Sequence, residues 1–420
     1  MIKRFVLAFF LVAGLSARGQ AFPPSVPVDV SGVKLNVGGF IQTDATLLDQ
    51  SAEDELDPAS RQPLNTERID VRRAHVRLDA QKSFVGAALE LDVNTVHGTQ
   101  VQVIAAEVMA DLGSGDPMRL PTLLISLGIT RIPFGYETPQ HDLLRPFLEQ
   151  SNLNRALFPG SYAPGLRARG AFRFMRYDVA LVTGEPIGAL QYPGQAPAHA
   201  VDLLGRGGVH AELAPGVTLD AGLSGLDGSG FHPGTPTTKD QLVWRDANGD
   251  GLVQLPEIQI IPGASAEPSS TFRRFALGAD GHVSARLPLA TLVVGGEAIW
   301  SQNLDRALYV ADPAATGRNQ RGSGFSASAV LQDLPGGLAL GVRYDRYNPD
   351  ADASDQQGAA RVPIDASLST LALLGSIRLE RILRLSIEYD RNRNAFGRGP
   401  TGAPASLAAD ALTTRAEVAF

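Results

Sequence analysis

The chain contains no cysteine in its 420 residues, and lysine occurs only at Lys3, Lys34, Lys82 and Lys239. The absence of cysteine excludes disulfide bonds and a lipid-modified N-terminal cysteine. Aromatic residues make up only 6% of the chain, and a formal net charge of −7 does not suit a nucleic-acid binder. Glycine, in contrast, is frequent, with 44 residues, and 44% of all residues are hydrophobic. This composition suits a large barrel, whose strands need to be apolar on only one face.

Long hydrophobic runs are also scarce, and the only one lies at the N-terminus. Two basic residues precede an apolar run over residues 5–15, and small residues follow it. This order predicts a secretory signal peptide over residues 1–21, cleaved after Gly19 or after Ala21. No other stretch approaches the roughly 20 apolar residues that a membrane-spanning helix requires. Because no linker divides the rest, residues 22–420 are predicted to form a single domain.

Alternation of apolar and polar residues with period two runs through most of the remaining chain. In ILRLSIEYD, residues 382–390, the leucines, isoleucine and tyrosine after the first residue share one face, and the charged and serine side chains share the other. Such alternation predicts half-buried β-strands. The strands are expected near residues 34–47, 68–80, 84–95, 99–112, 122–133, 164–174, 177–184, 203–213, 217–226, 271–286, 289–301, 323–333, 337–346, 366–379, 382–390 and 410–420.

The connections between these strands alternate between short and long. Tight links such as 81–83 and 287–288 follow long polar segments such as 48–67. In outer-membrane barrels the short turns face the periplasm and the long loops face the outside. The sequence therefore predicts an all-β fold, a transmembrane antiparallel β-barrel of about 16 strands, in the outer membrane of a Gram-negative bacterium. The last strand ends on Phe420, which looks like an outer-membrane assembly signal.

If one face of each strand meets lipid, the other face lines the lumen, and arginine is frequent there. A wall rich in guanidinium raises the local concentration of anions and offers bidentate partners to phosphate or carboxylate. The alternative is that these arginines pair with lumen carboxylates such as Glu90 and Glu388 and only brace the wall. The sequence favours a net electropositive lumen. The lumen candidates are Arg73, Arg77, Arg167, Arg169, Arg173, Arg274, Arg286, Arg343 and Arg384.

Motifs in the first half of the chain allow a comparison with known families. They are GFIQTDA at 39–45, VRRAHVRLD at 71–79 followed by ALELDVN at 88–94, and GITRIPFGYE at 128–137, which precedes FPGSYAPGLRARG at 158–170. On these motifs the chain resembles the phosphate-selective porin O and P family of outer-membrane channels. The resemblance implies a 16-stranded, usually trimeric barrel that passes anions or other small solutes down a gradient. The second half resembles the family only in its alternating strands and terminal phenylalanine.

One departure from that family concerns lysine. Phosphate-selective members are associated with lysine clusters beside the channel arginines, whereas here only Lys34 falls within a predicted strand. The resemblance therefore supports family membership better than it supports phosphate specificity.

The long segment 134–163 is the third external loop, the position from which porins commonly fold a loop into the pore. Its stretch HDLLRPFLEQSNLNRALF has apolar residues at helical spacing. We expect this segment to lie against the inner wall, with Arg145, Glu149 and Arg155 narrowing the channel. The alternative is a surface loop that packs against a neighbouring subunit.

The longest external segment, 227–270, carries the stretch DANGDGLVQLPE at 246–257. It fits the calcium-loop pattern D-x-[DN]-x-[DN]-G-x5-E at every fixed position, although Pro256 and the strand-like IQII after the motif are off-pattern. A generic turn rich in Asp, Asn and Gly would explain DANGDG. It would not explain why Gln254 and Glu257 stand at the spacing of calcium ligands. We therefore expect calcium to order this loop. The expected ligands are Asp246, Asn248, Asp250, Leu252, Gln254 and Glu257.

These observations favour a porin for passive diffusion of small anionic or neutral solutes, phosphate among them, embedded in outer-membrane lipid and assembled as a homotrimer. The alternative is a surface receptor or adhesin that acts through calcium-ordered loops. An enzyme is not expected, because none of the seven histidines has a nucleophile motif beside it.

Overall fold

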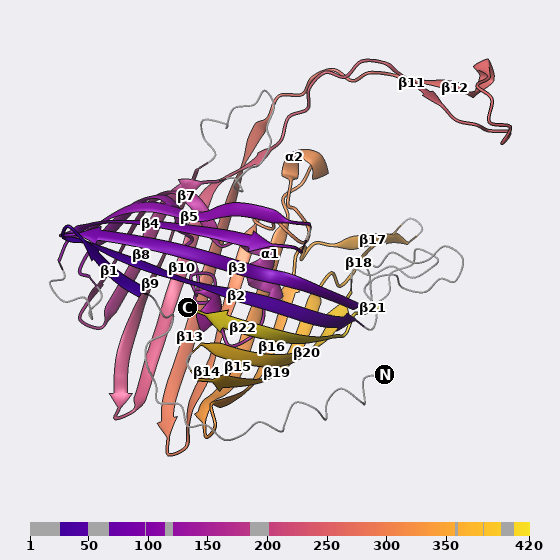
Figure 1. Cartoon of the computed structure of the whole chain (residues 1–420). Helices are drawn as coiled ribbons and strands as arrows, with labels where there is room; N and C mark the ends of the chain where they lie inside the picture. The colour runs from indigo at the N-terminus through magenta and orange to yellow at the C-terminus, as the bar shows by residue number, and fades with distance from the viewer. Residues whose placement is uncertain are drawn as a thin grey trace.

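The chain folds into a closed antiparallel β-barrel of 16 strands in a computed structural model (Figure 1). The structure describes residues 26–48, 67–96, 98–113, 121–184, 201–357, 360–380, 382–395 and 407–420. The predicted signal peptide, residues 1–21, lies outside the described residues. No helix in the described part of the chain is long and apolar enough to cross a membrane.

Each barrel strand pairs with its neighbours along the chain, and the connections alternate between short turns and long loops. The barrel strands are β2 (Val33–Leu48), β3 (Glu67–Lys82), β4 (Val85–Asn94), β5 (Gln100–Asp111), β6 (Leu124–Arg131), β7 (Tyr162–Phe172), β8 (Met175–Thr183), β9 (Val201–Ala214), β10 (Val217–His232), β13 (Ser270–Leu287), β14 (Ala290–Gln302), β15 (Arg321–Leu334), β16 (Leu338–Asn348), β19 (Leu368–Leu379), β20 (Leu383–Asn394) and β22 (Ala411–Ala419). All of the predicted strand spans are confirmed, with shifts of a few residues at their ends.

Closure of the barrel comes from pairing of the first and last barrel strands. β2 pairs with β22 from Phe40 opposite Ala419 to Leu48 opposite Ala411. The C-terminal Phe420 extends this ladder, because its backbone exchanges two hydrogen bonds with Gly39, at 2.8 and 2.9 Å. Closure leaves no unpaired sheet edge, which is the condition for a sheet to survive in lipid.

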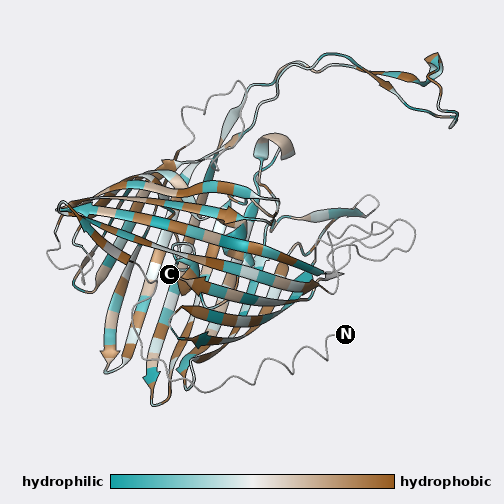
Figure 2. Cartoon of the chain, in the orientation of Figure 1, coloured by the Kyte–Doolittle hydropathy of each residue, from teal (hydrophilic) through white to brown (hydrophobic). Residues whose placement is uncertain are grey.

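The period-two pattern decides which side chains face lipid. Hydrophobic and hydrophilic residues alternate along the strands in Figure 2. On β20, Ser386 and Glu388 are each 1% exposed inside the barrel, whereas Tyr389 is 38% exposed on the outer face. Large apolar side chains such as Leu223 and Trp300 are exposed on the outside, where lipid would cover them.

Smaller elements decorate the barrel. A short strand that the sequence analysis did not predict, β1 (Val26–Val30), forms a hairpin with β2. Two hairpins lie in the long loops, β11 (Gln241–Trp244) with β12 (Ile258–Ile261) and β17 (Ser354–Gln357) with β18 (Ala360–Pro363). The remaining elements are η2 (Asp142–Leu144), α1 (Asn152–Leu157), η3 (Leu255–Glu257), α2 (Pro313–Thr316) and β21 (Leu407–Ala408). The β11–β12 hairpin projects far from the barrel rim (Figure 1).

Candidate functional site

The segment between β6 and β7, residues 132–161, turns into the barrel, and we call it the inner loop. It leaves the wall early because β6 ends at Arg131 after only 8 residues. The loop contains the single-turn η2 and the short helix α1, whose N-cap Ser151 accepts a hydrogen bond from the backbone N–H of Asn154. Its contacts, described next, join it to strands on every side of the lumen.

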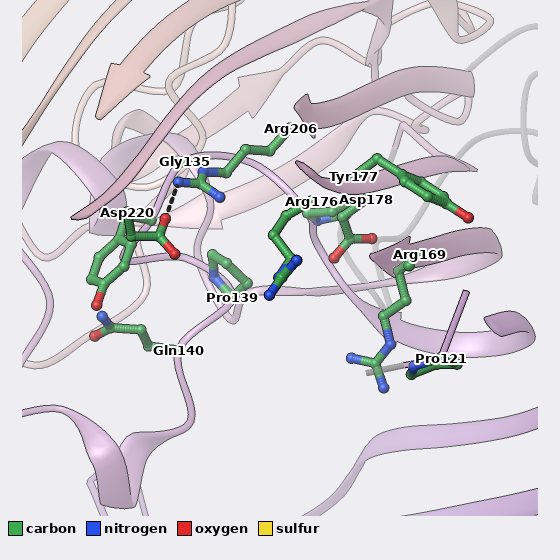
Figure 3. Close-up of a pocket in the computed structure, with 13 residues that line it drawn as sticks. Pro121, Gly135, Pro139, Gln140, Arg169, Arg176, Tyr177, Asp178, Arg206 and Asp220 are labelled. Carbon is green, nitrogen blue, oxygen red and sulfur yellow. Dashed lines mark hydrogen bonds and ion pairs between the residues drawn. The ribbon is translucent and has the colours of Figure 1, made fainter. Parts of the chain in front are cut away.

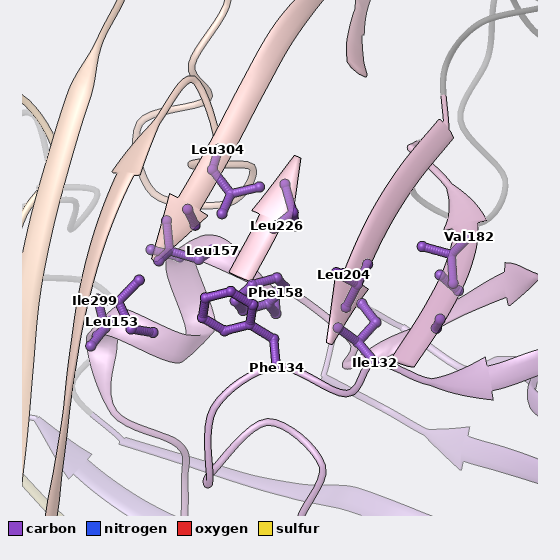
Figure 4. Packing of buried hydrophobic residues seen from close by; sticks show 14 of the residues in the cluster. Ile132, Phe134, Leu153, Leu157, Phe158, Val182, Leu204, Leu226, Ile299 and Leu304 are labelled. Atoms are coloured by element: carbon purple, nitrogen blue, oxygen red, sulfur yellow. The ribbon is translucent and has the colours of Figure 1, made fainter. Parts of the chain in front are cut away.

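An apolar cluster fixes the inner loop to one side of the wall (Figure 4). Phe134 and Leu157 of the loop are both completely buried. They pack in one cluster with Leu204 of β9, Leu226 of β10 and Ile299 of β14. The alternation in the sequence predicts polar side chains at inward positions, so these inward apolar residues differ from that prediction. It exists because the loop shields these positions from lumen water.

Ion pairs fix the inner loop to the opposite side of the wall. The carboxylate of Glu149 accepts from Arg72 and Arg73 of β3, each at 2.8 Å, and from Arg415 of β22 at 2.9 Å. Burial alone would raise the pKa of Glu149, but the guanidinium groups of Arg73, Arg72 and Arg415 outweigh it and hold the pKa well below its ordinary value. Arg415 also pairs with Asp44 of β2 at 2.7 Å. Glu149 therefore joins the loop to the seam where the barrel closes.

Further hydrogen bonds connect the loop to the strands that follow along the wall. The backbone N–H of Leu148 donates to Glu388 at 3.0 Å, and the side-chain amide of Asn152 donates to Asp345 at 2.9 Å. Arg343 donates to the backbone carbonyl of Glu149 at 2.7 Å and stacks over the ring of Phe147, 4.7 Å from its centroid. The loop thus contacts β16 and β20 as well as β3 and β22.

The start of the inner loop is fastened through its backbone. The N–H of Gly135 donates to Ser224 of β10 at 2.9 Å, and the N–H groups of Tyr136 and Glu137 donate to one carboxylate oxygen of Glu297 on β14 at 3.3 and 3.2 Å. Gly135 adopts φ +66°, and a Cβ there would lie 1.8 Å from the other oxygen of Glu297. Only glycine allows this approach.

Most of the arginines predicted to line the lumen are ion-paired with carboxylates of the wall or of the inner loop. Arg167 pairs with Asp178, and Arg274 pairs with Asp202. Such pairs cancel most of the field that each charge would project into the lumen. The remaining paired members are Arg73 with Glu149, Arg77 with Asp79 and Glu90, Arg343 with Glu137 and Asp345, and Arg384 with Glu417. These six arginines therefore brace the wall or, in the case of Arg73 and Arg343, also hold the inner loop against it.

The other three predicted arginines differ in position. Arg169 faces the lumen on β7 and makes no ion pair with a described residue. Arg286 is exposed near the short-turn end of β13. Arg173 was predicted to lie on a strand and to face the lumen, which is wrong. β7 ends at Phe172, and Arg173 occupies the following turn with φ +55°, its guanidinium over the ring of Phe172.

The three residues expected to narrow the channel are all in the inner loop but play different parts. Arg145 is buried and donates to Asp142 at 2.8 Å, and Glu149 is the anchor described above. Arg155 is exposed on α1. The sequence analysis missed Arg72, because a β-bulge opposite Gln42 and Thr43 turns two successive arginines to the same side.

The calcium-like loop at the tip of the β11–β12 hairpin is a compact turn. One carboxylate oxygen of Asp246 accepts from the backbone N–H of Gly249 at 2.7 Å, and the other accepts from Gly251 at 2.8 Å. Glu257 instead accepts from the indole of Trp244 and from the N–H of Ala247, both at 3.1 Å. Within the described residues, no group of three or more acidic, histidine or cysteine side chains is placed to hold a metal ion. The donor types suit calcium, but Glu257 would have to exchange partners.

His75 of β3 is buried, and both of its ring nitrogens are occupied. Nδ1 lies 2.8 Å from Glu90, and Nε2 lies 3.3 Å from Asp92. A histidine held between two carboxylates of the adjacent strand braces the wall and has no nitrogen left to activate a nucleophile.

Comparison with known proteins identifies the fold. No protein-family profile and no curated protein matches the chain. Among solved structures, the chain is similar to the outer membrane channel DcaP of Acinetobacter baumannii, at 12% identity and TM-score 0.56 over 93% of this chain and 99% of that one. It is also similar to an anion-selective porin from Comamonas acidovorans, at 10% identity and TM-score 0.53 over 92% and 100%. A trimer form of OmpT of Vibrio cholerae matches at 9% identity and TM-score 0.50 over 93% and 100%.

The chain therefore has the fold of an outer-membrane porin, a closed 16-stranded barrel with a loop packed inside it. This fold places it in the outer membrane of a Gram-negative bacterium. At these identities the likeness establishes the architecture, and the solute has to be argued from the residues of this chain.

Proposed function

We propose that this protein is a passive pore for small solutes, with a weak preference for anions. The observation that carries the proposal is the inner loop, which crosses the lumen of a closed barrel and is held to the wall by Glu149 and by the apolar cluster. Barrels of 16 to 18 strands leave an aqueous channel in their lumen, and a loop fixed inside such a barrel narrows that channel. Neutral solutes would pass as well, limited by size.

The preference for anions rests on the arginines that remain after pairing. Ion-paired arginines contribute little net charge to the lumen. Arg155 is exposed on α1, and Arg169 and Arg176 make no ion pair with a described residue. A few uncompensated guanidinium groups in a low-dielectric wall raise the local concentration of anions. Phosphate is one candidate, in line with the resemblance to the phosphate-selective porin O and P family, although the scarcity of lysine argues for a more general anion pathway.

Conductance in planar bilayers tests this proposal. Under a potassium chloride gradient we expect a reversal potential that indicates modest preference for chloride, and Arg155→Gln should reduce it. Arg245→Gln, which removes an exposed arginine from the distant β11–β12 hairpin, should leave the reversal potential unchanged. Absence of conductance would refute the pore, and a cation-selective reversal potential would refute the anion preference. Current block at low phosphate concentration would mark a phosphate-selective channel.

We also propose that the protein assembles as a homotrimer in outer-membrane lipid. The similar OmpT structure in a trimer form supports this assembly. Light scattering of the detergent-solubilised protein, corrected for bound detergent, would give three times the chain mass; a single chain mass would refute it.

Calcium is proposed as a structural ion for the β11–β12 hairpin. The motif supplies carboxylate and amide oxygens at the spacing that calcium uses, and bound calcium would add a divalent charge that ties the turn together. Asp246, Asn248, Asp250 and Glu257 would provide side-chain oxygens, with Leu252 and Gln254 completing the set.

A further inference from the structure

A cavity of about 360 Å³ lies between the start of the inner loop and the wall formed by β7 to β10 (Figure 3). The wall residues of β7 and β8 lie on either side of the short turn that joins these strands, and Arg206 and Asp220 come from β9 and β10. Pro121 comes from the connection between β5 and β6. The cavity is therefore on the short-turn side of the inner loop, which faces the periplasm in barrels of this kind. A solute would reach it after passing the loop.

Two guanidinium groups face this cavity without a carboxylate partner among the residues that the structure describes. Arg169 makes neither an ion pair nor a hydrogen bond with any residue that the structure describes, and Figure 3 shows it beside Pro121. Within the described part of the chain, Arg176 donates from one nitrogen only, to the backbone carbonyls of Arg173 and Met175, both at 3.0 Å. Its second terminal nitrogen and its Nε remain available to a ligand.

The two carboxylates that line the same cavity are already occupied. Asp178 accepts from Nε of Arg167 at 2.7 Å, and Asp220 accepts from Arg206 at 2.7 Å. Arg206 also donates a hydrogen bond to Asp280, at 2.9 Å, so its charge is balanced by two carboxylates. The excess charge of the cavity therefore belongs to Arg169 and Arg176, and two adjacent cations favour an anionic ligand.

Apart from Gln140, the rest of the lining is largely apolar and includes the rings of Tyr136 and Tyr177. Pro133 and Pro139 of the inner loop border the cavity together with Tyr136. The ring of Tyr136 is fixed by stacking on His282 of β13, with ring centroids 3.5 Å apart and planes inclined by 20°. Contact with such surfaces does not stabilise a hydrated inorganic ion. A planar carbon skeleton is stabilised by it, because its apolar surface is removed from water.

We propose that this cavity is a binding subsite for a small organic carboxylate with a planar apolar body. Arg169 and Arg176 hold the carboxylate, and Tyr136 with the two prolines covers the body. This inference rests on the proposed function, because the ligand reaches the cavity through the pore, and it narrows the solutes from anions in general to organic acids.

The experiment uses benzoate as the probe and the full-length protein in detergent micelles. Saturation-transfer NMR reports binding whether or not the protein conducts, so failure of the subsite is distinguishable from failure of the pore. We expect benzoate to bind, benzyl alcohol to bind at least about tenfold more weakly because it lacks the charge, and acetate to bind at least about tenfold more weakly because it lacks the ring.

Variants assign the binding to the proposed residues. Arg169→Gln with Arg176→Gln should weaken benzoate binding by about tenfold or more, and Tyr136→Leu should weaken benzoate more than acetate. The matched control is Arg286→Gln, which removes an exposed arginine at the same end of the barrel outside the cavity and should leave binding unchanged. Each variant is checked for folding by its heat-dependent shift in gel mobility.

Several outcomes would overturn the proposal. They are absence of benzoate binding to the folded protein, equal affinity for benzoate and benzyl alcohol, equal affinity for benzoate and inorganic phosphate, and binding that survives loss of both arginines in a folded variant. If the reversal potential nevertheless shows anion preference, the pore stands and the subsite fails.

Discussion

The inner loop and the β11–β12 hairpin both connect barrel strands at the long-loop end, yet one folds into the lumen and the other extends away from the rim (Figure 1). The charged side chains of the inner loop find partners on distant strands, as Glu149 does with Arg73 and Arg415. Those of the hairpin find partners within the hairpin, as Glu257 does with Trp244. Complementarity between a loop and the wall, rather than loop length, decides where a loop lies.

The apolar residues of the two segments show the same contrast. Phe134 and Leu153 in the inner loop are fully buried against the wall. In the hairpin, Leu242, Leu252 and Leu255 are exposed by 65% or more. Neither hairpin strand packs against the barrel. Mutations in the hairpin should therefore leave conduction through the pore unchanged, whereas mutations in the inner loop should alter it.

The largest effect is expected from Glu149→Gln. The change leaves the guanidinium groups of Arg72, Arg73 and Arg415 without their shared carboxylate, and loss of one partner from this partly buried cluster costs about 1–3 kcal/mol. We expect a larger and noisier single-channel conductance and a lower midpoint in heat-dependent gel mobility. Glu67→Gln, at an exposed position on β3, is the control; equal conductance in the two variants would contradict the role of the anchor.

The same anchor predicts a pH dependence. Because the folded-state pKa of Glu149 is held well below its ordinary value of 4.5, the anchor contributes stability above pH 4.5 and loses it only as the pH falls through the lower folded-state pKa. Conductance should therefore stay constant from neutral pH down to about 4.5 and rise only in stronger acid. A rise already near pH 6 would show that another group holds the loop.

A smaller effect is expected from Gly135→Ala. Alanine at positive φ costs about 1 kcal/mol, and here its Cβ would also meet Glu297 at 1.8 Å. Gly160→Ala is a matched control in the same loop, because Gly160 also has positive φ, +80°, but no atom lies within 4 Å of a Cβ there. Both variants should lower the thermal midpoint, and only Gly135→Ala should change the conductance. The same change in both would assign the effect to backbone strain alone.

Removal of the hairpin should have almost no effect on the pore. Residues 236–266 can be replaced by Asn-Gly, because Thr235 and Glu267 exchange backbone hydrogen bonds at 2.7 and 2.9 Å and keep the ends together. We expect unchanged reversal potential and a thermal midpoint within about 2 °C. A loss of anion preference would show that the hairpin takes part in conduction.

The smallest expected effect is that of calcium on the hairpin. Trp244 donates its indole N–H to Glu257, and this hydrogen bond lowers the pKa of Glu257. Calcium coordinated by Glu257 would compete for that bond, so Trp244 fluorescence should change with calcium in a Trp300→Phe background, and Glu257→Gln should abolish the change. A spectrum that does not respond to millimolar calcium would refute calcium binding.

The barrel was predictable from sequence because alternation and turn spacing are local signals. The first strand of the β2 hairpin, β1, was missed because VPVDV is short and contains proline. Arg173 was placed on a strand because the strand was taken to end two residues too late. Local sequence patterns therefore predict that a strand exists more accurately than they predict the residue at which it ends.

The site was less predictable, because its interactions join residues that are far apart in the chain. Arg274 pairs with Asp202, which lies 72 residues away, and this pairing depends on the register of intervening strands. Arg72 turns inward only because of a bulge, which alternation does not reveal. The inward apolar positions on β9, β10 and β14 make sense only once the inner loop covers them.

The seam between β2 and β22 has a consequence for how the protein folds. Asp44 and Arg415 are separated by 371 residues, so their pairing carries a large loop-closure entropy and belongs late in assembly. Glu149 shares Arg415, and so the anchor of the inner loop is complete only after the seam has formed. Before the seam forms, Glu149 can be held only by Arg72 and Arg73 of β3, so closure of the barrel adds the last ion pair of the anchor. The full hold on the inner loop thus depends on a seam between two strands at opposite ends of the chain.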